Sequence, residues 1–180
     1  MTDNLFLGPD AQIRMTLQTL RRHDGEGRIG GGATPILDGV FLSNDADARI
    51  TGDYRCADTN MIKVQMRPGS EAPSRWQGMH IVMGPAGLDG AAVVGIVARS
   101  RSAASITTRL CIRSGRGDRF VDTFFPKTMV SFAQPSTHLD ILEIASTPDL
   151  PRQAGWRDLI LFFRTGEVDL ELLDMRLFIL

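Results

Sequence analysis

Apolar and polar residues alternate in short runs along most of the chain. The residues Ile62, Val64 and Met66 alternate with polar neighbours, and the segment 105–113 repeats this period of two. Successive side chains of a β-strand leave opposite faces, so such runs indicate strands with one buried and one solvated face. The run at 158–165, DLILFFRT, is apolar on both faces, which is typical of a central strand. The pattern therefore predicts an all-β protein.

Stretches rich in Gly, Pro, Asp and Ser separate these runs and indicate turns. Segments with a helical period are nearly absent between them, which argues against alternating α/β units. We therefore predict an antiparallel two-sheet β-sandwich of the jelly-roll type. The expected strands are 36–43, 48–54, 61–67, 78–84, 91–100, 105–113, 119–125, 127–133, 138–145, 158–164 and 167–180. The expected core residues are Ile62, Val64, Met66, Ile81, Ile96, Leu110, Ile112, Leu161 and Phe163.

The first part of the chain differs from the rest. From Asp10, an expected cap, the residues Ile13, Leu17 and Leu20 share one face of a helix that would end near residue 22. The same stretch also alternates as a strand would, because Ile13, Met15 and Leu17 occupy every second position. The helix is the preferred interpretation, and the strand remains open.

A glycine-rich run at 25–35 follows and is typical of a flexible connector. We therefore divide the chain into an N-terminal arm with its connector, 1–35, and a sandwich domain, 36–180. The arm carries apolar side chains that a sandwich does not need, and a connector would let it reach another molecule. This predicts a homo-oligomer, or docking on a larger assembly through the arm; the alternative is that the first expected strand pairs within its own sheet.

Composition narrows the class of protein. The chain has 180 residues, of which 43% are hydrophobic and 23% charged, as in one ordinary globular domain. The formal net charge of −1 lacks the basic excess that nucleic-acid binding requires. No apolar run approaches the roughly 20 residues of a membrane-spanning helix, and the N-terminus has no signal-peptide pattern. We expect synthesis in the cytoplasm, no membrane insertion and no nucleic-acid partner.

Motifs for catalysis are missing from the sequence. His23, His80 and His138 are far apart and show no zinc-ligand spacing. There is no GxSxG or GxxxxGK[ST] motif, and the glycines at 25–32 do not follow a clear strand, so we predict a protein that is not an enzyme and needs no cofactor. Cys56 and Cys111 are expected to be buried thiols, with a disulfide between them as the lesser alternative.

Acidic residues cluster in one region and could supply oxygen ligands to calcium. Their spacing does not match an EF-hand, and ordinary turns are rich in Asp and Asn. We therefore predict no metal. The cluster consists of Asp45, Asp47, Asp53 and Asp58, with Asn44 and Asn60 nearby.

Basic and polar residues occupy the outward positions of several expected strands. If these strands are neighbours, the side chains form one hydrogen-bonding face that suits hydroxyl-rich or carboxylate ligands. A solvated sheet face is the simpler alternative. Trp76 lies in a loop beside this face, and Trp156 lies just before a central strand, where either indole could stack on a sugar or close an end of the sandwich. The candidate ligand-binding residues are Gln65, Arg67, Trp76, His80, Arg109 and Arg113.

The C-terminal stretch 156–180, together with MIKVQMR at 61–67 and WQGMHIVMG at 76–84, resembles the strand pattern of carbohydrate-binding modules and related jelly-roll domains. In those domains a strand pair of this kind, with an acidic residue such as Asp174 before the last strand, closes the sandwich. The resemblance implies a non-catalytic module that binds a glycan. We expect a polysaccharide ligand, preferably an acidic one. The alternative is a structural spike, fibre or capsid-adaptor component of a phage-like particle that contacts only protein and is released with the particle.

Overall fold

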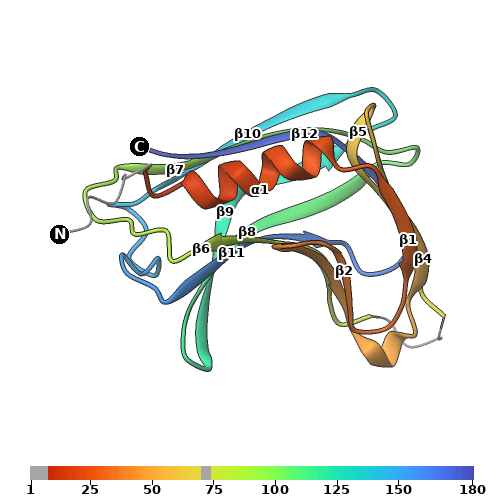
Figure 1. The fold of residues 1–180 in the computed structure, drawn as a ribbon, viewed down its shortest axis with the longest axis horizontal. Helices are drawn as coiled ribbons and strands as arrows, with labels where there is room; N and C mark the ends of the chain where they lie inside the picture. The colour runs from red at the N-terminus through yellow and green to blue at the C-terminus, as the bar shows by residue number, and fades with distance from the viewer. Residues whose placement is uncertain (1–7, 70–73) are drawn as a thin grey trace.

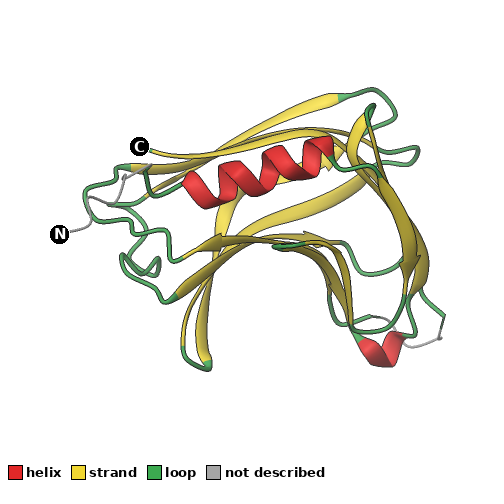
Figure 2. Ribbon diagram, in the orientation of Figure 1, coloured by secondary structure: helices red, strands yellow, loops and turns green. Residues whose placement is uncertain are grey.

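The computed structural model describes residues 8–69 and 74–180. Two six-stranded antiparallel sheets pack face to face, with a helix against their open side (Figures 1 and 2). Sheet A contains, in spatial order, β1 (Gly25–Ile29), β4 (Thr51–Ala57), β5 (Asn60–Arg67), β12 (Val168–Ile179), β7 (Val93–Arg101) and β10 (Ser136–Glu143). Sheet B contains β2 (Ala33–Leu37), β3 (Val40–Asn44), β6 (Gln77–Gly84), β11 (Trp156–Phe163), β8 (Ile106–Arg116) and β9 (Arg119–Ser131). The predicted antiparallel β-sandwich is confirmed.

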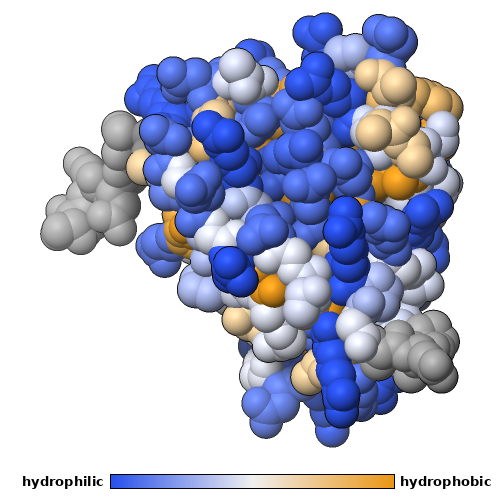
Figure 3. All heavy atoms as spheres, turned by 90° about the vertical axis from the view of Figure 1, so that its right-hand side faces the viewer, coloured by the Kyte–Doolittle hydropathy of each residue, from blue (hydrophilic) through white to orange (hydrophobic). Residues whose placement is uncertain are grey.

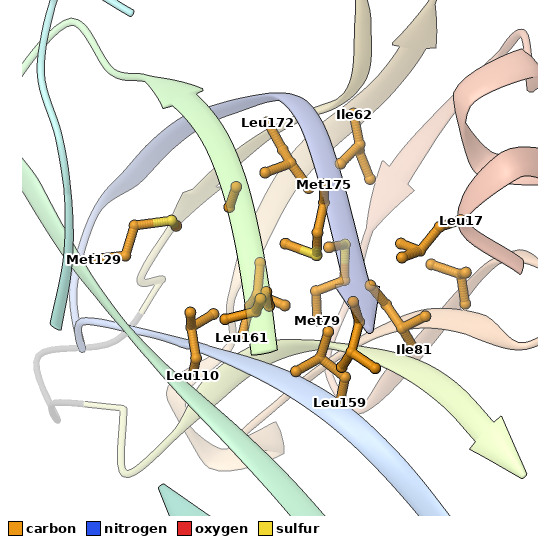
Figure 4. Close-up of a cluster of buried hydrophobic side chains, with 14 of the residues drawn as sticks. Leu17, Ile62, Met79, Ile81, Leu110, Met129, Leu159, Leu161, Leu172 and Met175 are labelled. Carbon is orange, nitrogen blue, oxygen red and sulfur yellow. The ribbon is translucent and has the colours of Figure 1, made fainter. Parts of the chain in front are cut away.

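The core lies between the sheets, where the apolar sides of their strands meet. Met79, Ile81 and Leu161 of sheet B point toward Ile62 and Leu172 of sheet A (Figure 4). All nine residues predicted for the core are buried, because strict alternation assigns each of them to the inner face of its strand.

Two strand predictions were wrong in detail. The expected strand 36–43 is a hairpin, since Gly39 adopts a φ of +77° and the chain reverses between β2 and β3. The expected strands 119–125 and 127–133 form the single strand β9, in spite of Pro126 between them. Proline is tolerated there because β9 is an edge strand and its pairing with β8 is irregular at this point.

The division into an arm and a sandwich is corrected by the structure. The helix α1 (Ala11–Arg22) forms as the preferred interpretation predicted, but it is not a free arm. Its residues Ile13, Leu17 and Leu20 are buried in the common core. Its contacts include β6 of sheet B and β4, β5 and β12 of sheet A, so it covers the open side of the sandwich (Figure 1).

The glycine-rich connector is also part of the fold. Residues 25–29 form β1, which pairs with β4, and residues 33–37 form β2. Gly27 lies beneath the ring of Tyr54, where an added Cβ would come within 2.7 Å of the ring. Glycine therefore serves close packing in this strand and not flexibility. Residues of α1, β1 and β2 contact their own chain, and the homo-oligomer or docked assembly stays a prediction.

Sheet B is curved, and its outer face lies on the inside of the curve. The tip of the β8–β9 hairpin and the short 3₁₀ turn η1 (Ala46–Ala48) lie at opposite ends of the molecule, both below the strands of sheet B in the view of Figure 2. Within the described ranges, no helix is long and apolar enough to cross a membrane.

Candidate functional site

The six candidate residues do not form one face, as the sequence analysis supposed. Gln65 and Arg67 lie on β5 in sheet A, whereas His80 lies on β6, and Arg109 and Arg113 lie on β8, all in sheet B. The outer faces of the two sheets point in opposite directions. Alternation correctly predicted which side chains point outward, but strand pairing is non-local, and β5 pairs with β4 and β12.

On the outer face of sheet A, several charged side chains of β5, β7 and β12 are paired with one another. Arg67 pairs with Glu167 at 3.2 Å, and Gln65 donates a hydrogen bond of 3.3 Å to Asp169. Arg101 donates two hydrogen bonds to Glu171 and thereby lowers the pKa of that carboxyl group. The part of the surface over β1 and β4 is largely hydrophilic (Figure 3). A shallow hollow of about 530 Å³ there is lined mainly by charged and polar side chains: Glu26, Arg28, Asp53, Arg55, Lys63 and Gln65.

The outer face of sheet B has a different character, because aromatic rings lie among its polar groups. One row of paired residues runs across it. Phe41 pairs with His80, which is followed across the sheet by Ile160, Cys111 and Phe124. We call this surface the aromatic face; its members are Phe41, Ser43, His80, Arg109, Arg113, Phe120, Asp122, Phe124, Trp156, Asp158 and Phe162.

His80 lies at the centre of the aromatic face and organises its neighbours. Its ring stacks on Phe41, with centroids 4.6 Å apart and 14° between the planes. Its Nε2 lies 3.1 Å from Oγ of Ser43, and its Nδ1 lies 3.3 Å from a carboxylate oxygen of Asp158. With only 7% of its surface exposed, His80 positions the other side chains and offers little area to a ligand.

Arg113 is fixed on both sides. It donates two hydrogen bonds of 2.7 Å to Asp122 on the neighbouring strand, and this pairing raises the pKa of the guanidinium group. The same group lies over the ring of Phe120, 4.0 Å from its centroid. Its charge is therefore already neutralised, and Phe120 presents an oriented ring.

Arg109 is held differently. Its guanidinium carbon lies 3.9 Å from the centroid of Phe124, whose ring in turn packs against Phe162 at 5.8 Å. The side chain is exposed, and among the described residues it has no carboxylate partner. It is therefore an oriented cation with free donor groups.

Trp156 lies flat across β8 at one end of the aromatic face. Gly115 makes this possible, because an added Cβ would come within 2.2 Å of the indole ring. The next residue, Arg157, is fully buried and donates hydrogen bonds to the carbonyl oxygens of Ala86 at 3.0 Å and Pro151 at 2.6 Å. Arg157 thus holds two loops against the end of the sheet that carries Trp156.

Trp76 is exposed just before β6, at the opposite end of the sheet. Its carbonyl oxygen accepts hydrogen bonds from the amide of Asp45 and from Ser74. Arg75 beside it donates two hydrogen bonds to the Asp45 carboxylate, of 2.7 and 2.8 Å, and holds the pKa of Asp45 far below its usual range. The indole is therefore set on a well-anchored turn.

The same contacts account for the acidic cluster. Asp45 and Asp47 both pair with Arg75, so guanidinium nitrogens occupy their oxygens. Asp53 lies on β4 and Asp58 in the turn before β5. The four carboxylates are not brought together.

Sequence reasoning missed the phenylalanines of the aromatic face. Phe120, Asp122 and Phe124 occupy every second position of β9 and so share one face of the strand, which was a usable signal. Phe162 lies in the run 158–165, which is apolar on both faces and which we assigned to full burial. Its ring is only partly buried, because nothing but side chains of the same face covers it.

No protein-family model matches the chain, and no curated protein matches it either. Among solved structures, it is similar to the family 11 carbohydrate-binding module of Clostridium thermocellum, in complex with a β-1,3-1,4-mixed-linked tetrasaccharide, with 10% identity, a TM-score of 0.46, and coverage of 84% of this chain and 87% of the module. It is also similar to the CBM22-1 xylan-binding domain of Paenibacillus barcinonensis Xyn10C, with 13% identity, a TM-score of 0.38, and coverage of 81% and 90%. These proteins belong to the class that the C-terminal strand pattern resembled. At such identities and TM-scores, a ligand has to be inferred from the residues of this chain itself.

Proposed function

We propose that the aromatic face binds a polysaccharide chain without catalysing a reaction. The observation that carries the proposal is the placement of aromatic rings at outward positions of a curved sheet, where hydrophobicity alone would put them inside. Phe120 lies under the Arg113 guanidinium, Phe162 packs on Phe124, and Trp156 lies over Gly115. Rings presented in this way offer flat apolar surfaces to sugar rings, while adjacent polar groups can bond to hydroxyls.

The polar groups of the face support binding more than catalysis. Asp122 is engaged by Arg113, and Asp158 lies beside His80. A general acid or base needs a proton that it can exchange with the ligand. Carboxylates committed to basic neighbours are better suited to holding side chains in position.

Affinity electrophoresis of the full chain against a panel of soluble plant and bacterial polysaccharides tests the proposal. Phe120→Ala should weaken binding at least fivefold, because one stacking contact contributes about 1 kcal/mol. Leu139→Ala is the matched control, since Leu139 is also 52% exposed but lies on the outer face of sheet A. A reducing-end assay on the same polysaccharides detects any cleavage.

Failure of every polysaccharide to retard the protein would overturn the proposal and favour a structural role in which the sheet faces contact only protein. Equal weakening by Phe120→Ala and Leu139→Ala would place binding elsewhere.

A further inference from the structure

We propose that the aromatic face selects an anionic polysaccharide, and that Arg109 binds the carboxylate of a uronic acid residue within it. This inference rests on the proposed function and specifies its ligand class. Its starting point is the contrast between two arginines on one strand: Arg113 is paired with Asp122, whereas Arg109 rests on Phe124 with no carboxylate partner among the described residues.

No acidic residue of the aromatic face pairs with Arg109. The acidic members of the aromatic face, Asp122 and Asp158, are both in register with Arg113. Arg113 is four residues from Arg109 on β8, and four strand residues span about 13 Å. Asp122 is committed to Arg113 and Asp158 lies beside His80, and neither pairs with Arg109. The residues in register beside Arg109 itself are Phe162 and Thr128, which are neutral.

The shape of the group also suits a carboxylate. A guanidinium fork presents donors in its plane and binds both oxygens of a carboxylate at once. Phe124 covers one flat side of the Arg109 fork at 3.9 Å, so its orientation is set before a ligand arrives. Phe162 lies in register beside it and packs on Phe124, which places a ring where the sugar bearing that carboxylate would stack.

Three uronic acid polymers serve as probes: polygalacturonate, alginate and hyaluronan. Each is compared with its carboxyl-reduced form, which keeps the sugar backbone and removes the charge, and with neutral glucan and xylan. Binding is measured by isothermal titration calorimetry at 0.15 M salt, a condition set at roughly physiological ionic strength. We expect a uronate polymer to bind and its reduced form to bind about 10- to 100-fold more weakly, as befits a lost charge-assisted contact.

Three variants assign the effect to one residue. Arg109→Gln should lose about 10- to 100-fold in affinity for the uronate polymer and much less for the reduced form, which offers the guanidinium no charge. The affinity of Arg109→Lys for the uronate polymer should lie between those of the parent and of Arg109→Gln, because lysine keeps the charge but cannot bind in the bidentate manner. Arg67→Gln is the control, since it removes the same charge from an exposed position on the opposite sheet. Thermal unfolding checks that each variant remains folded.

The outcomes separate the two proposals. Equal affinity for uronate and reduced polymers, or binding of neutral polymers alone, would overturn the carboxylate subsite and leave polysaccharide binding intact. An equal loss of uronate affinity in Arg67→Gln and Arg109→Gln would also overturn the carboxylate subsite. The polymer would then be attracted by the net charge of the protein and not by one residue. Absence of binding to every polymer would instead remove the proposed function.

Discussion

Arg113 and Asp122 form a bidentate ion pair between adjacent strands of sheet B, and both of its hydrogen bonds measure 2.7 Å. Both side chains are largely shielded from solvent, unlike the exposed pair Arg67–Glu167. Asp122→Asn should therefore lower the free energy of unfolding by about 1 kcal/mol. Glu167→Gln, the matched control, should have almost no effect, because exposed pairs contribute little. Urea unfolding measures both, and equal losses would contradict the assignment.

Arg157 is the largest fully buried side chain, and burial lowers the pKa of its guanidinium group. Its hydrogen bonds go to loop carbonyl oxygens and to Ser114, with no carboxylate partner among the described residues. Arg157→Met would leave these carbonyls without donors. It should lower the free energy of unfolding, measured with urea, by about 3 kcal/mol. Arg176→Met, at an exposed position, should change stability by less than about 0.5 kcal/mol. A small effect at Arg157 would mean that the loops are held by other contacts.

The helix α1 should be essential to the sandwich. Leu17→Ala removes a buried side chain from the contact between α1 and the sheets, so it should lower the free energy of unfolding by about 2–5 kcal/mol. Met15→Ala on the same helix should be close to neutral, because Met15 is 64% exposed. Chemical unfolding followed by circular dichroism compares the two. If α1 were a detachable arm, neither substitution would shift the main unfolding transition.

Stability should fall in mildly acidic solution because of His138. Burial is the main cause that lowers the pKa of His138 from its usual value of 6.5; nearby Lys127 acts in the same direction and Asp140 opposes them. The unfolded chain therefore binds a proton that the folded chain does not, so this contribution is complete above pH 6.5 and is lost as pH falls toward the lowered pKa. His138→Gln should flatten the dependence of unfolding free energy on pH in that window. An unchanged slope would assign the loss to other groups.

Both cysteines should be unreactive in the folded protein. Burial raises the pKa of Cys56 to about 11 and that of Cys111 to about 12, and both thiols are unpaired. Because the thiolate is the nucleophile, neither should react appreciably with a thiol reagent at pH 8 until the chain unfolds. Absorbance during reaction with a disulfide reagent, with and without denaturant, gives the comparison. Rapid reaction of the native protein at either position would contradict its burial.

Alternation could be read from the sequence because it is a local property. It placed Ile62 and Leu110 in the core and turned Gln65 and Arg109 outward. It could not say that β5 belongs to one sheet and β8 to the other, since that depends on pairing between distant segments. The candidate site was therefore predicted as one surface, and the structure divides it between two.

Glycine was the second source of error. A run such as 25–35 suggests flexibility, yet Gly27 accommodates the ring of Tyr54 within a strand. In the same way, Gly115 accommodates the indole of Trp156, which no local pattern would have revealed. Both contacts join different strands, so they become visible only when the sheets are assembled.

The position of the last two strands sets the order in which the molecule can form. In sheet A, β12 lies between β5 and β7, and in sheet B, β11 lies between β6 and β8. Until residues 156–179 leave the ribosome, each sheet exists only as two halves with no strand to join them. The helix α1 also lacks its contact between Arg21 and Asp174, which are 153 positions apart. The two complete sheets, and the core between them, can therefore form only when these two strands insert, near the end of synthesis.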